Sequence, residues 1–194
     1  DDGSVVAGVS TSALSPSFGE AFRWTEATGL VGLGGLPVDL DPVSVPWGLS
    51  ADGAIVVGWA FSENGREAFR WNEFEGMIGM GDLPSGSFDS WATAVSADGS
   101  VIVGLANGEG QTSFRWTAAT GMVDLGRPPG AGGSQAWGVS ADGSVVVGDA
   151  PLAGDIVPTI WNEGQGMRNL VDSLVELGLG PAMAGWNLEQ AIAV

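Results

Sequence analysis

Short apolar runs alternate with tight polar turns along most of this chain. In residues 137–148, two apolar runs flank Ala141-Asp142-Gly143. Runs of this length around Asp-Gly are typical of a β-hairpin, because Gly and Asp tolerate the positive φ of a turn that matches strand twist. The Phe-Arg-Trp and Gly-Met-Val runs of each unit predict two further short strands, separated by Thr-Gly or Glu-Gly turns. Helical periodicity is confined to residues 171–179, for which we predict two helical turns.

Three motifs recur in the same order four times. A turn Asp-Gly with a later Gly begins at Asp2, Asp52, Asp98 and Asp142. An aromatic anchor ends at Trp24, Trp71, Trp116 and Trp161, and a Gly-Leu or Gly-Met run begins at Gly29, Gly76, Gly121 and Gly166. Four strands in each repeat of about 44–50 residues form one propeller blade. We therefore predict an all-β fold in one domain: a small β-propeller of four blades, each with four antiparallel strands.

The ends of the chain predict how the blades meet. The units span about 1–42, 43–87, 88–132 and 133–171, followed by an insertion at 172–185 and a closing strand at 186–194. The first unit lacks a strand before its Asp-Gly turn, and residues 190–194 resemble residues 135–139. We predict that this C-terminal strand completes the first blade and closes the ring.

Two alternatives to ring closure stay open. The C-terminal strand could instead complete the first blade of the next molecule and build a filament. The four units could also be an excerpt from a larger propeller or an open array. The chain begins at Asp1 without an initiating Met or a signal peptide, which is typical of a mature or excised piece.

The composition limits the classes of partner that the chain is expected to bind. Asp and Glu number 23 against 6 basic residues, giving a net charge of −17 and a pI near 4.1. Phosphate binding needs a basic surface, so we expect no nucleic-acid partner, and an anionic membrane is disfavoured for the same reason. No apolar run approaches the ~20 residues of a membrane span. High acidity without Lys suits a secreted or cell-surface protein, and ordinary acidic bias is the alternative interpretation.

The chain has no Lys, His, Tyr or Cys. The thiolate nucleophile, the imidazole base, the Schiff-base amine and the phenolic acid are therefore absent. Zinc, iron–sulfur and haem sites also lose their usual ligands. We predict no catalytic residues, no enzyme activity and no cofactor other than calcium, while a glycosidase-like carboxylate pair stays an open alternative.

The repeated motifs resemble a known family. Residues 140–148 (Ser-Ala-Asp-Gly-Ser-Val-Val-Val-Gly), 21–25 (Ala-Phe-Arg-Trp-Thr) and 121–126 (Gly-Met-Val-Asp-Leu-Gly), together with the tail from Gly185, resemble the HAF repeat family of extracellular bacterial proteins. The resemblance implies a secreted or surface-attached repeat protein with no established catalytic residues. The departures are Thr159-Ile160 in place of Phe-Arg, and Arg127-Pro128-Pro129.

Carboxylates are mainly turn formers in this sequence. The repeated Asp of each Asp-Gly is expected to shape its turn. Asp39 and Asp41 alone approach the alternating spacing of calcium ligands, so they are the candidate metal site.

Tryptophan supplies the remaining candidates. Trp24, Trp71, Trp116 and Trp161 share one repeat position, which predicts packing between adjacent blades. The arginines before the first three are expected to point to the opposite face of the strand. Trp47, Trp91, Trp137 and Trp186 are the candidate ligand-binding residues, because an exposed Trp beside polar groups stacks on sugar rings. Two functions follow: a structural module that associates with itself, or a lectin-like module for surface glycans. A binding site is expected where the units differ, at 38–46, 85–90, 128–133 and 171–186.

Overall fold

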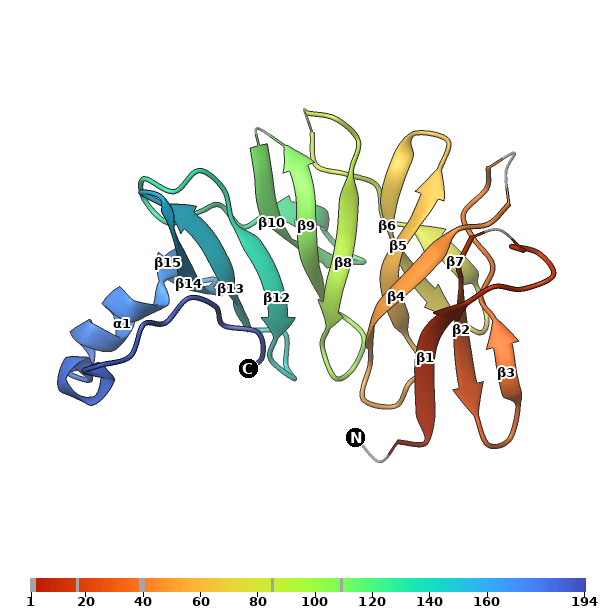
Figure 1. The fold of residues 1–194 in the computed structure, drawn as a ribbon, viewed down its shortest axis with the longest axis horizontal. Helices are drawn as coiled ribbons and strands as arrows, with labels where there is room; N and C mark the ends of the chain where they lie inside the picture. Colours follow the sequence, from red (N-terminus) through yellow and green to blue (C-terminus); the bar gives the residue numbers. More distant parts are fainter. Residues whose placement is uncertain (1–2, 17, 39–40, 85, 109) are drawn as a thin grey trace.

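The computed structural model describes residues 3–16, 18–38, 41–84, 86–108 and 110–194. Its strands form four separate antiparallel sheets, which we call blades 1 to 4 (Figure 1). Blade 1 contains β1 (Val5–Ser10), β2 (Glu20–Thr25) and β3 (Gly29–Gly32). Blade 2 contains β4 (Ser44–Leu49), β5 (Val56–Ser62), β6 (Gly65–Asn72) and β7 (Gly76–Gly79). Blade 3 contains β8 (Ser90–Val95), β9 (Ile102–Gly108), β10 (Gly110–Thr117) and β11 (Gly121–Asp124). Blade 4 contains β12 (Gln135–Val139), β13 (Val145–Leu152), β14 (Asp155–Asn162) and β15 (Gly166–Asn169).

Each blade is a simple meander in which consecutive strands pair. The prediction of four strands per unit is confirmed for blades 2 to 4, where β4, β8 and β12 are the first strands of their sheets. It is wrong for blade 1, which has three strands. Here β1 pairs with β2 on one side, and no described strand pairs with its other edge.

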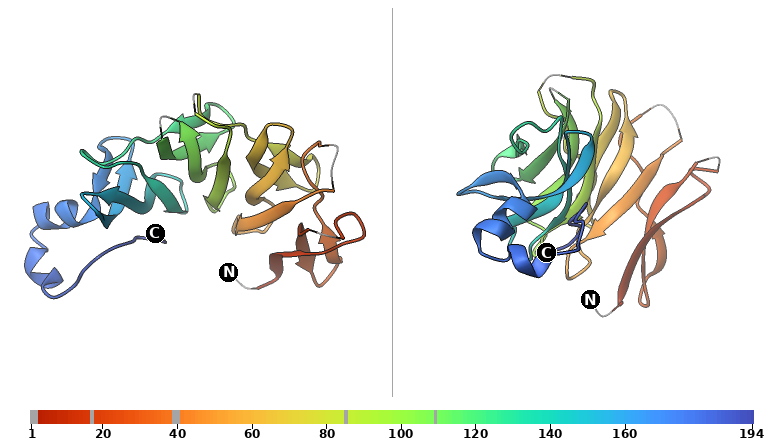
Figure 2. Two further views of the ribbon diagram at one scale, coloured as in Figure 1. Left: turned by 45° about the horizontal axis from the view of Figure 1, so that its top comes forward. Right: turned by 60° about the vertical axis from the view of Figure 1, so that its left-hand side comes forward.

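The four blades follow one another in an arc that is open between blade 1 and blade 4 (Figure 2). The predicted pairing of the C-terminal strand with blade 1 is therefore wrong for this structure: residues 186–194 form no strand. Instead they lie against blade 4, where the amide of Ala191 donates to the carbonyl of Gly148 at 3.2 Å. The packing between consecutive blades sets the angle of the arc, and that angle keeps the two ends apart.

The core consists of three apolar clusters, one at each joint between consecutive blades. Leu36 of blade 1 packs with Val56 and Phe69 of blade 2, and the next two joints repeat this arrangement. Trp71, Trp116 and Trp161 each pack against one of these clusters, which confirms the prediction for three of the four anchors. The hydrophobic effect therefore stabilises the joints rather than a single centre.

A repeated glycine lets the first two strands of a complete blade approach closely. The first strand carries a β-bulge, and the glycine opposite it is Gly58, Gly104 or Gly148. A Cβ at any of them would collide with a backbone carbonyl oxygen of the first strand, those of Val45, Trp91 and Gln135 respectively. The close approach of the two strands therefore requires glycine at these positions.

The Asp-Gly turns are held by the carboxylate itself. In the turn of blade 3, Asp98 Oδ1 accepts hydrogen bonds from the Ser96 hydroxyl at 2.7 Å and from the Ser100 amide at 2.9 Å. These bonds favour the ionised form, and they lower the pKa of Asp98 to about 2, led by the bond from the Ser100 amide. Asp142 has the same arrangement, and its pKa is also lowered to about 2. The turn-forming role is confirmed at both positions.

We expect acid to weaken the fold through these turns. The pKa of Asp98 and Asp142 is lower in the folded chain than the ordinary 3.8, so their contribution is present above about pH 4 and is lost as the pH falls towards 2. Urea unfolding followed by Trp fluorescence should give a flat midpoint from pH 7 to 5 and a falling one below pH 4. Asp98→Asn should flatten part of that fall, and Asp155→Asn at an exposed carboxyl serves as control. An Asp98→Asn profile with the slope of the parent would contradict the assignment.

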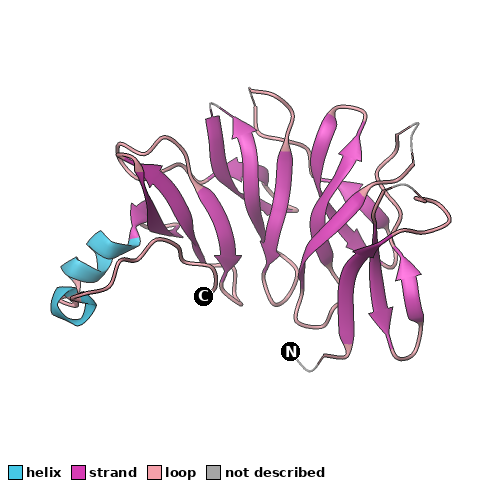
Figure 3. Ribbon diagram, viewed as in Figure 1, coloured by secondary structure: helices cyan, strands magenta, loops and turns pink. Residues whose placement is uncertain are grey.

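One helix follows the last strand (Figure 3). α1 (Leu170–Glu176) begins at Asn169, whose side chain accepts a hydrogen bond from the Val171 amide at 2.8 Å. The helix prediction is confirmed, although the helix ends earlier than expected, before Gly178 with its φ of 79°. A short 3-10 turn, η1 (Gly180–Met183), leads into the tail. No helix in the described ranges has the length and apolar character needed to cross a membrane.

Candidate interaction surface

A buried serine fastens every joint between described blades. The Ser90 hydroxyl accepts the amide of Ala68 in the preceding blade at 3.0 Å and donates to the carbonyl of Gly81 at 2.6 Å. Ser44 and Ser134 make the same two bonds at the other joints. Each serine therefore satisfies an amide and a carbonyl that the joint removes from water.

Removing this hydroxyl should weaken a joint. We expect Ser90→Ala to lower the free energy of unfolding by about 1–3 kcal/mol, because the amide of Ala68 would remain buried without an acceptor. Ser87→Ala, at an exposed hydroxyl three residues before the start of β8, is the matched control and should change the free energy of unfolding by less than about 0.5 kcal/mol. Equal urea midpoints for the two variants would contradict the role of Ser90.

The repeated arginine points towards the following blade, whereas the repeated tryptophan points towards the preceding one. Arg23 Nε donates to the carbonyl of Gly53 in the next blade at 2.8 Å, and Arg115 Nε donates to that of Gly143 at 3.4 Å. Arg70 instead forms an ion pair with Glu75 at 2.9 Å. The expectation that these arginines point away from the tryptophans is confirmed for Arg23 and Arg115 by these bonds to the following blade.

Blade 1 leaves an apolar face uncovered at one end of the arc. Val6 is 45% exposed, whereas the residues at the same repeat position are buried: Val56 at 0%, Ile102 at 0% and Val146 at 1%. Leu30 is 61% exposed against 8% for its counterpart Met167. Trp24 is 37% exposed, whereas the other three repeated anchors are partly buried. We call Val6, Trp24 and Leu30 the end face.

At the other end of the arc, the tail occupies the place that the first strand of a further blade would take. A Cβ on Gly138 would lie 2.8 Å from the carbonyl oxygen of Ile192 and 3.1 Å from Cα of Ala193. In the joint between blades 2 and 3, a Cβ on Gly48 would meet the carbonyl oxygen of Thr93 and Cα of Ala94 at 3.4 and 3.3 Å. The tail therefore meets β12 as β8 meets β4.

The chemistry of this last joint differs from that of the other three. The residue at the position of the serine is Glu189, and the residue at the position of the amide donor is Pro158, which has no N–H. Gln190 holds the tail instead: its Nε2 donates to Asp149 Oδ2 at 2.9 Å, and Trp137 Nε1 donates to the same oxygen at 2.6 Å. The donor and the acceptor of the serine bond have thus both been replaced.

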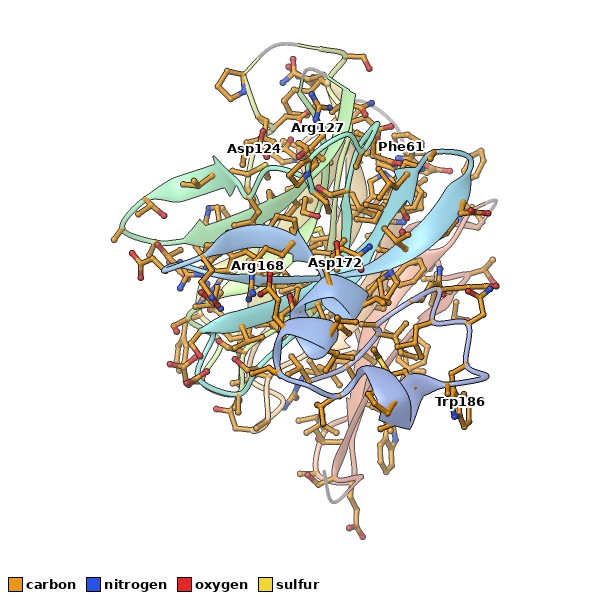
Figure 4. All side chains as sticks on the ribbon, turned by 90° about the vertical axis from the view of Figure 1, so that its left-hand side faces the viewer. Phe61, Asp124, Arg127, Arg168, Asp172 and Trp186 are labelled. Carbon is orange, nitrogen blue, oxygen red and sulfur yellow. The ribbon has the colours of Figure 1, made fainter. Side chains whose placement is uncertain are left out.

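The repeated arginine has moved to the neighbouring strand in blade 4. In blades 1 to 3 the arginine faces an aliphatic residue across the strand pair, as in Arg115↔Val123, whereas blade 4 has Ile160↔Arg168. Directly opposed residues lie on the same face of a sheet, so Arg168 lies on the same face of its blade as the arginines of blades 1 to 3. Arg168 Nε is buried without a hydrogen-bond partner, and Figure 4, which looks onto this end of the arc, labels Arg168 and Asp172 beside α1.

A cluster of aromatic and charged side chains bridges blades 2 and 3. Arg66 and Asp89 form a two-point ion pair, Nε–Oδ1 at 2.7 Å and Nη2–Oδ2 at 2.9 Å. The guanidinium lies 3.9 Å from the centroid of the Trp91 ring, and Trp59 lies 6.5 Å from the same ring. The hydrogen bonds from Arg66 are the main cause of the lowered pKa of Asp89, whereas burial raises that of Asp82, which accepts the Asp89 amide. The charged groups of this cluster form ion pairs and hydrogen bonds with one another, so the cluster links blades 2 and 3. We call the pair Arg66 and Asp89, with the Trp91 ring, the clasp.

The structure does not assemble the four predicted ligand-binding tryptophans into one site. Trp47, Trp91 and Trp137 lie in the first strands of three different blades, and Trp186 projects from the tail (Figure 4). Trp47 is 52% exposed, while Arg66 covers Trp91 and Asp149 holds Trp137. The clasp formed by Arg66 and Asp89 was missed in the sequence, and the only signal for it was an arginine outside the repeated position.

The candidate calcium site lies partly outside the described residues. Asp39 is not among them, and Asp41 is exposed. Within the ranges that the structure describes, no three acidic side chains gather in a group that would hold a metal ion. Calcium at Asp39 and Asp41 stays a prediction.

Comparisons with known proteins show a similarity of fold. No family model and no curated protein matches the sequence. Among solved structures, TolB from Acinetobacter baumannii is similar over 86% of this chain and 40% of its own, with a TM-score of 0.57 and 15% identity. A putative TolB from Agrobacterium tumefaciens is similar over 87% of this chain and 61% of its own, with a TM-score of 0.60 and 14% identity. The chain thus spans less than two thirds of either protein, and the likeness supports a β-propeller-like fold.

Proposed function

We propose that this chain is a non-catalytic structural module, secreted or held at the cell surface, whose copies join end to end. The observation that carries the proposal is the end face, because Val6, Trp24 and Leu30 are each exposed, whereas the residues at their repeat positions in blades 2 to 4 are buried or partly buried. Full burial of a large apolar side chain contributes about 1.5–3 kcal/mol. A second blade on Val6, Trp24 and Leu30 would therefore be stabilised by several such contributions.

The absence of catalysis rests on how the carboxylates are used. The chain has no Lys, His, Tyr or Cys. Asp52, Asp98 and Asp142 are bound within their turns, and Asp89 is bound to Arg66. These contacts favour a structural role for the acidic side chains.

A secreted or surface location is supported by the acidic composition and by the HAF-like motifs. A net charge of −17 keeps separate copies soluble through mutual repulsion, and salt screens that repulsion. Cell fractionation and surface labelling of the source organism would test the location, and a purely cytosolic pool would contradict it.

Sedimentation velocity across protein concentrations tests the assembly. We expect the average mass of the sedimenting species to rise with protein concentration, and to rise further at higher ionic strength. Leu30→Glu should suppress the increase, because it places a charge on the end face. Phe74→Glu, at a side chain that is 96% exposed on a turn of blade 2, adds the same charge elsewhere and should leave assembly intact. A chain that stays monomeric at every concentration and salt level would contradict the proposal.

One observation favours sugar binding as a second candidate function. The Trp47 ring is more than half exposed on the first strand of blade 2, where a sugar face has access to it. A glycan array with the parent chain and Trp47→Ala tests this candidate: a signal that the substitution abolishes would support it, and an array without signal would refute it.

A further inference from the structure

We propose that residues 189–194 of one copy add to the free edge of β1 in a second copy, as the missing first strand of its blade 1. This proposal rests on the end-to-end assembly proposed above and specifies the atoms of the joint. The C-terminal segment would pair antiparallel with β1, so that blade 1 would gain a fourth strand and resemble blades 2 to 4.

The register follows from the repeat. Residues 190–194 occupy the repeat positions of β12, Gln135–Val139. In each complete blade, the first residue of this stretch is opposite the first residue after the repeated glycine: Val45↔Trp59, Trp91↔Leu105 and Gln135↔Asp149. The same register places Gln190 opposite Val9 of the second copy.

Both partners of this joint are already exposed and correctly placed. Val9 is 48% exposed on β1, and Ile192 and Val194 of the tail are exposed as well. The tail lies on β12 with the contacts of a first strand, so it presents its other side to an incoming blade. An edge strand with unpaired backbone groups is a template for such an addition.

Arg168 supplies a second contact to the same joint. In blades 1 and 3, the arginine donates to the carbonyl of the glycine in the facing Asp-Gly turn. The corresponding glycine at the start of the chain is Gly3. Arg168 lies opposite Ile160, on the same face of its sheet as the repeated arginines of the other blades. Its Nε has no partner and is buried in the single copy, so the side chain would reorient on docking to donate to the Gly3 carbonyl of the second copy.

A second copy fits this edge better than the tail of the same chain. The tail of this chain stays on blade 4, and the arc keeps blade 1 away from it (Figure 2). To close the ring, all three joints would have to tighten, yet their cores contain side chains such as Phe69, Ile102 and Val146 that are already fully buried. Such cores resist a change of shape. Docking of a second copy leaves every joint as it is.

The chain has no cysteine, so engineered cysteines report the register directly. Opposed residues of antiparallel strands have Cα atoms about 4.5–5.5 Å apart, within the range of a disulfide. Under mild oxidation, Val9→Cys combined with Gln190→Cys in one chain should give a ladder of covalent multimers on non-reducing gels. A mixture of the two single variants should give dimers only. The control pair, Val9→Cys with Glu189→Cys, is shifted by one residue and should not cross-link.

Each outcome of the cross-linking experiment supports or overturns a stated part of the proposal. A cross-linked monomer would overturn the proposal in favour of a closed ring, and equal cross-linking of the control pair would overturn the register. Failure to cross-link while sedimentation still shows assembly would overturn the strand addition alone, and failure of both would remove the proposed function as well. Arg168→Leu should raise the protein concentration at which assembly is half complete at least threefold, whereas Arg127→Leu should not. An unchanged half-assembly concentration for Arg168→Leu would remove Arg168 from the joint.

Discussion

Phe114→Ala is expected to lower the free energy of unfolding by about 3–5 kcal/mol. The Phe114 ring is fully buried in the joint between blades 2 and 3, where it packs with Ile102 and Leu83. Its removal takes apolar surface away from the joint and leaves a cavity that the surrounding strands fill only in part. Urea unfolding followed by Trp fluorescence measures the loss.

The chain contains its own control for this substitution. Phe22 occupies the same repeat position in blade 1 but is only partly buried, because no blade covers the end face. Phe22→Ala should therefore lower the free energy of unfolding by less than half as much as Phe114→Ala does, when both are measured in dilute, low-salt solution, where copies stay apart. Equal losses for the two substitutions would show that the end face is covered in the monomer.

Gly104→Ala is expected to lower the free energy of unfolding by about 3 kcal/mol, although it adds only one methyl group. The added Cβ would collide with the Trp91 carbonyl oxygen and would lie 2.9 Å from Cα of Ala92 and from Cε1 of Phe114. The nearest atoms are backbone, and the ring is locked in the core, so the strands must separate. Chemical denaturation of the variant measures the loss.

Gly132→Ala is the matched control. A Cβ there would lie 3.9 Å from Cγ of Pro151, an ordinary contact. We expect a change within about 0.5 kcal/mol. If Gly104→Ala were equally mild, the close approach of β8 and β9 at the bulge would not be needed for stability.

The strands, turns and joints could be predicted because each follows from local chemistry that recurs. The Asp-Gly turns and the packing of Trp71 between blades each depend on residues within one unit or two consecutive units. Repetition supplied several independent instances of each pattern, so the sequence alone indicated which residues share a position.

The opening of the arc could not be predicted in the same way. Strand number and register do not determine the angle between blades, since that angle depends on how apolar side chains of two sheets interlock. Ring closure was inferred from the likeness of residues 190–194 to β12, and that likeness holds equally for a strand that completes another copy.

The clasp between blades 2 and 3 was missed for a related reason. Arg66 and Asp89 have no counterparts of the same residue type in the other units, since the position of Arg66 holds Gln111 in blade 3 and Ile156 in blade 4, so the repeat gave no second instance to compare. Trp91 was predicted as a ligand-binding residue because it is an aromatic ring outside the repeated anchor. The structure shows that Arg66 already covers its face.

The last joint of the arc has a consequence for the lifetime of an assembly. Opening a joint inside the chain separates the amide of Ala68 from the Ser90 hydroxyl, and the covalent connection brings them back together. Pro158 and Glu189, which stand at the positions of that amide and that hydroxyl, belong to the same copy, so the joint between copies depends on the strand added to β1 and has no covalent connection. Copies should therefore exchange between assemblies while each chain remains folded, and an assembly of this kind would renew its members one at a time.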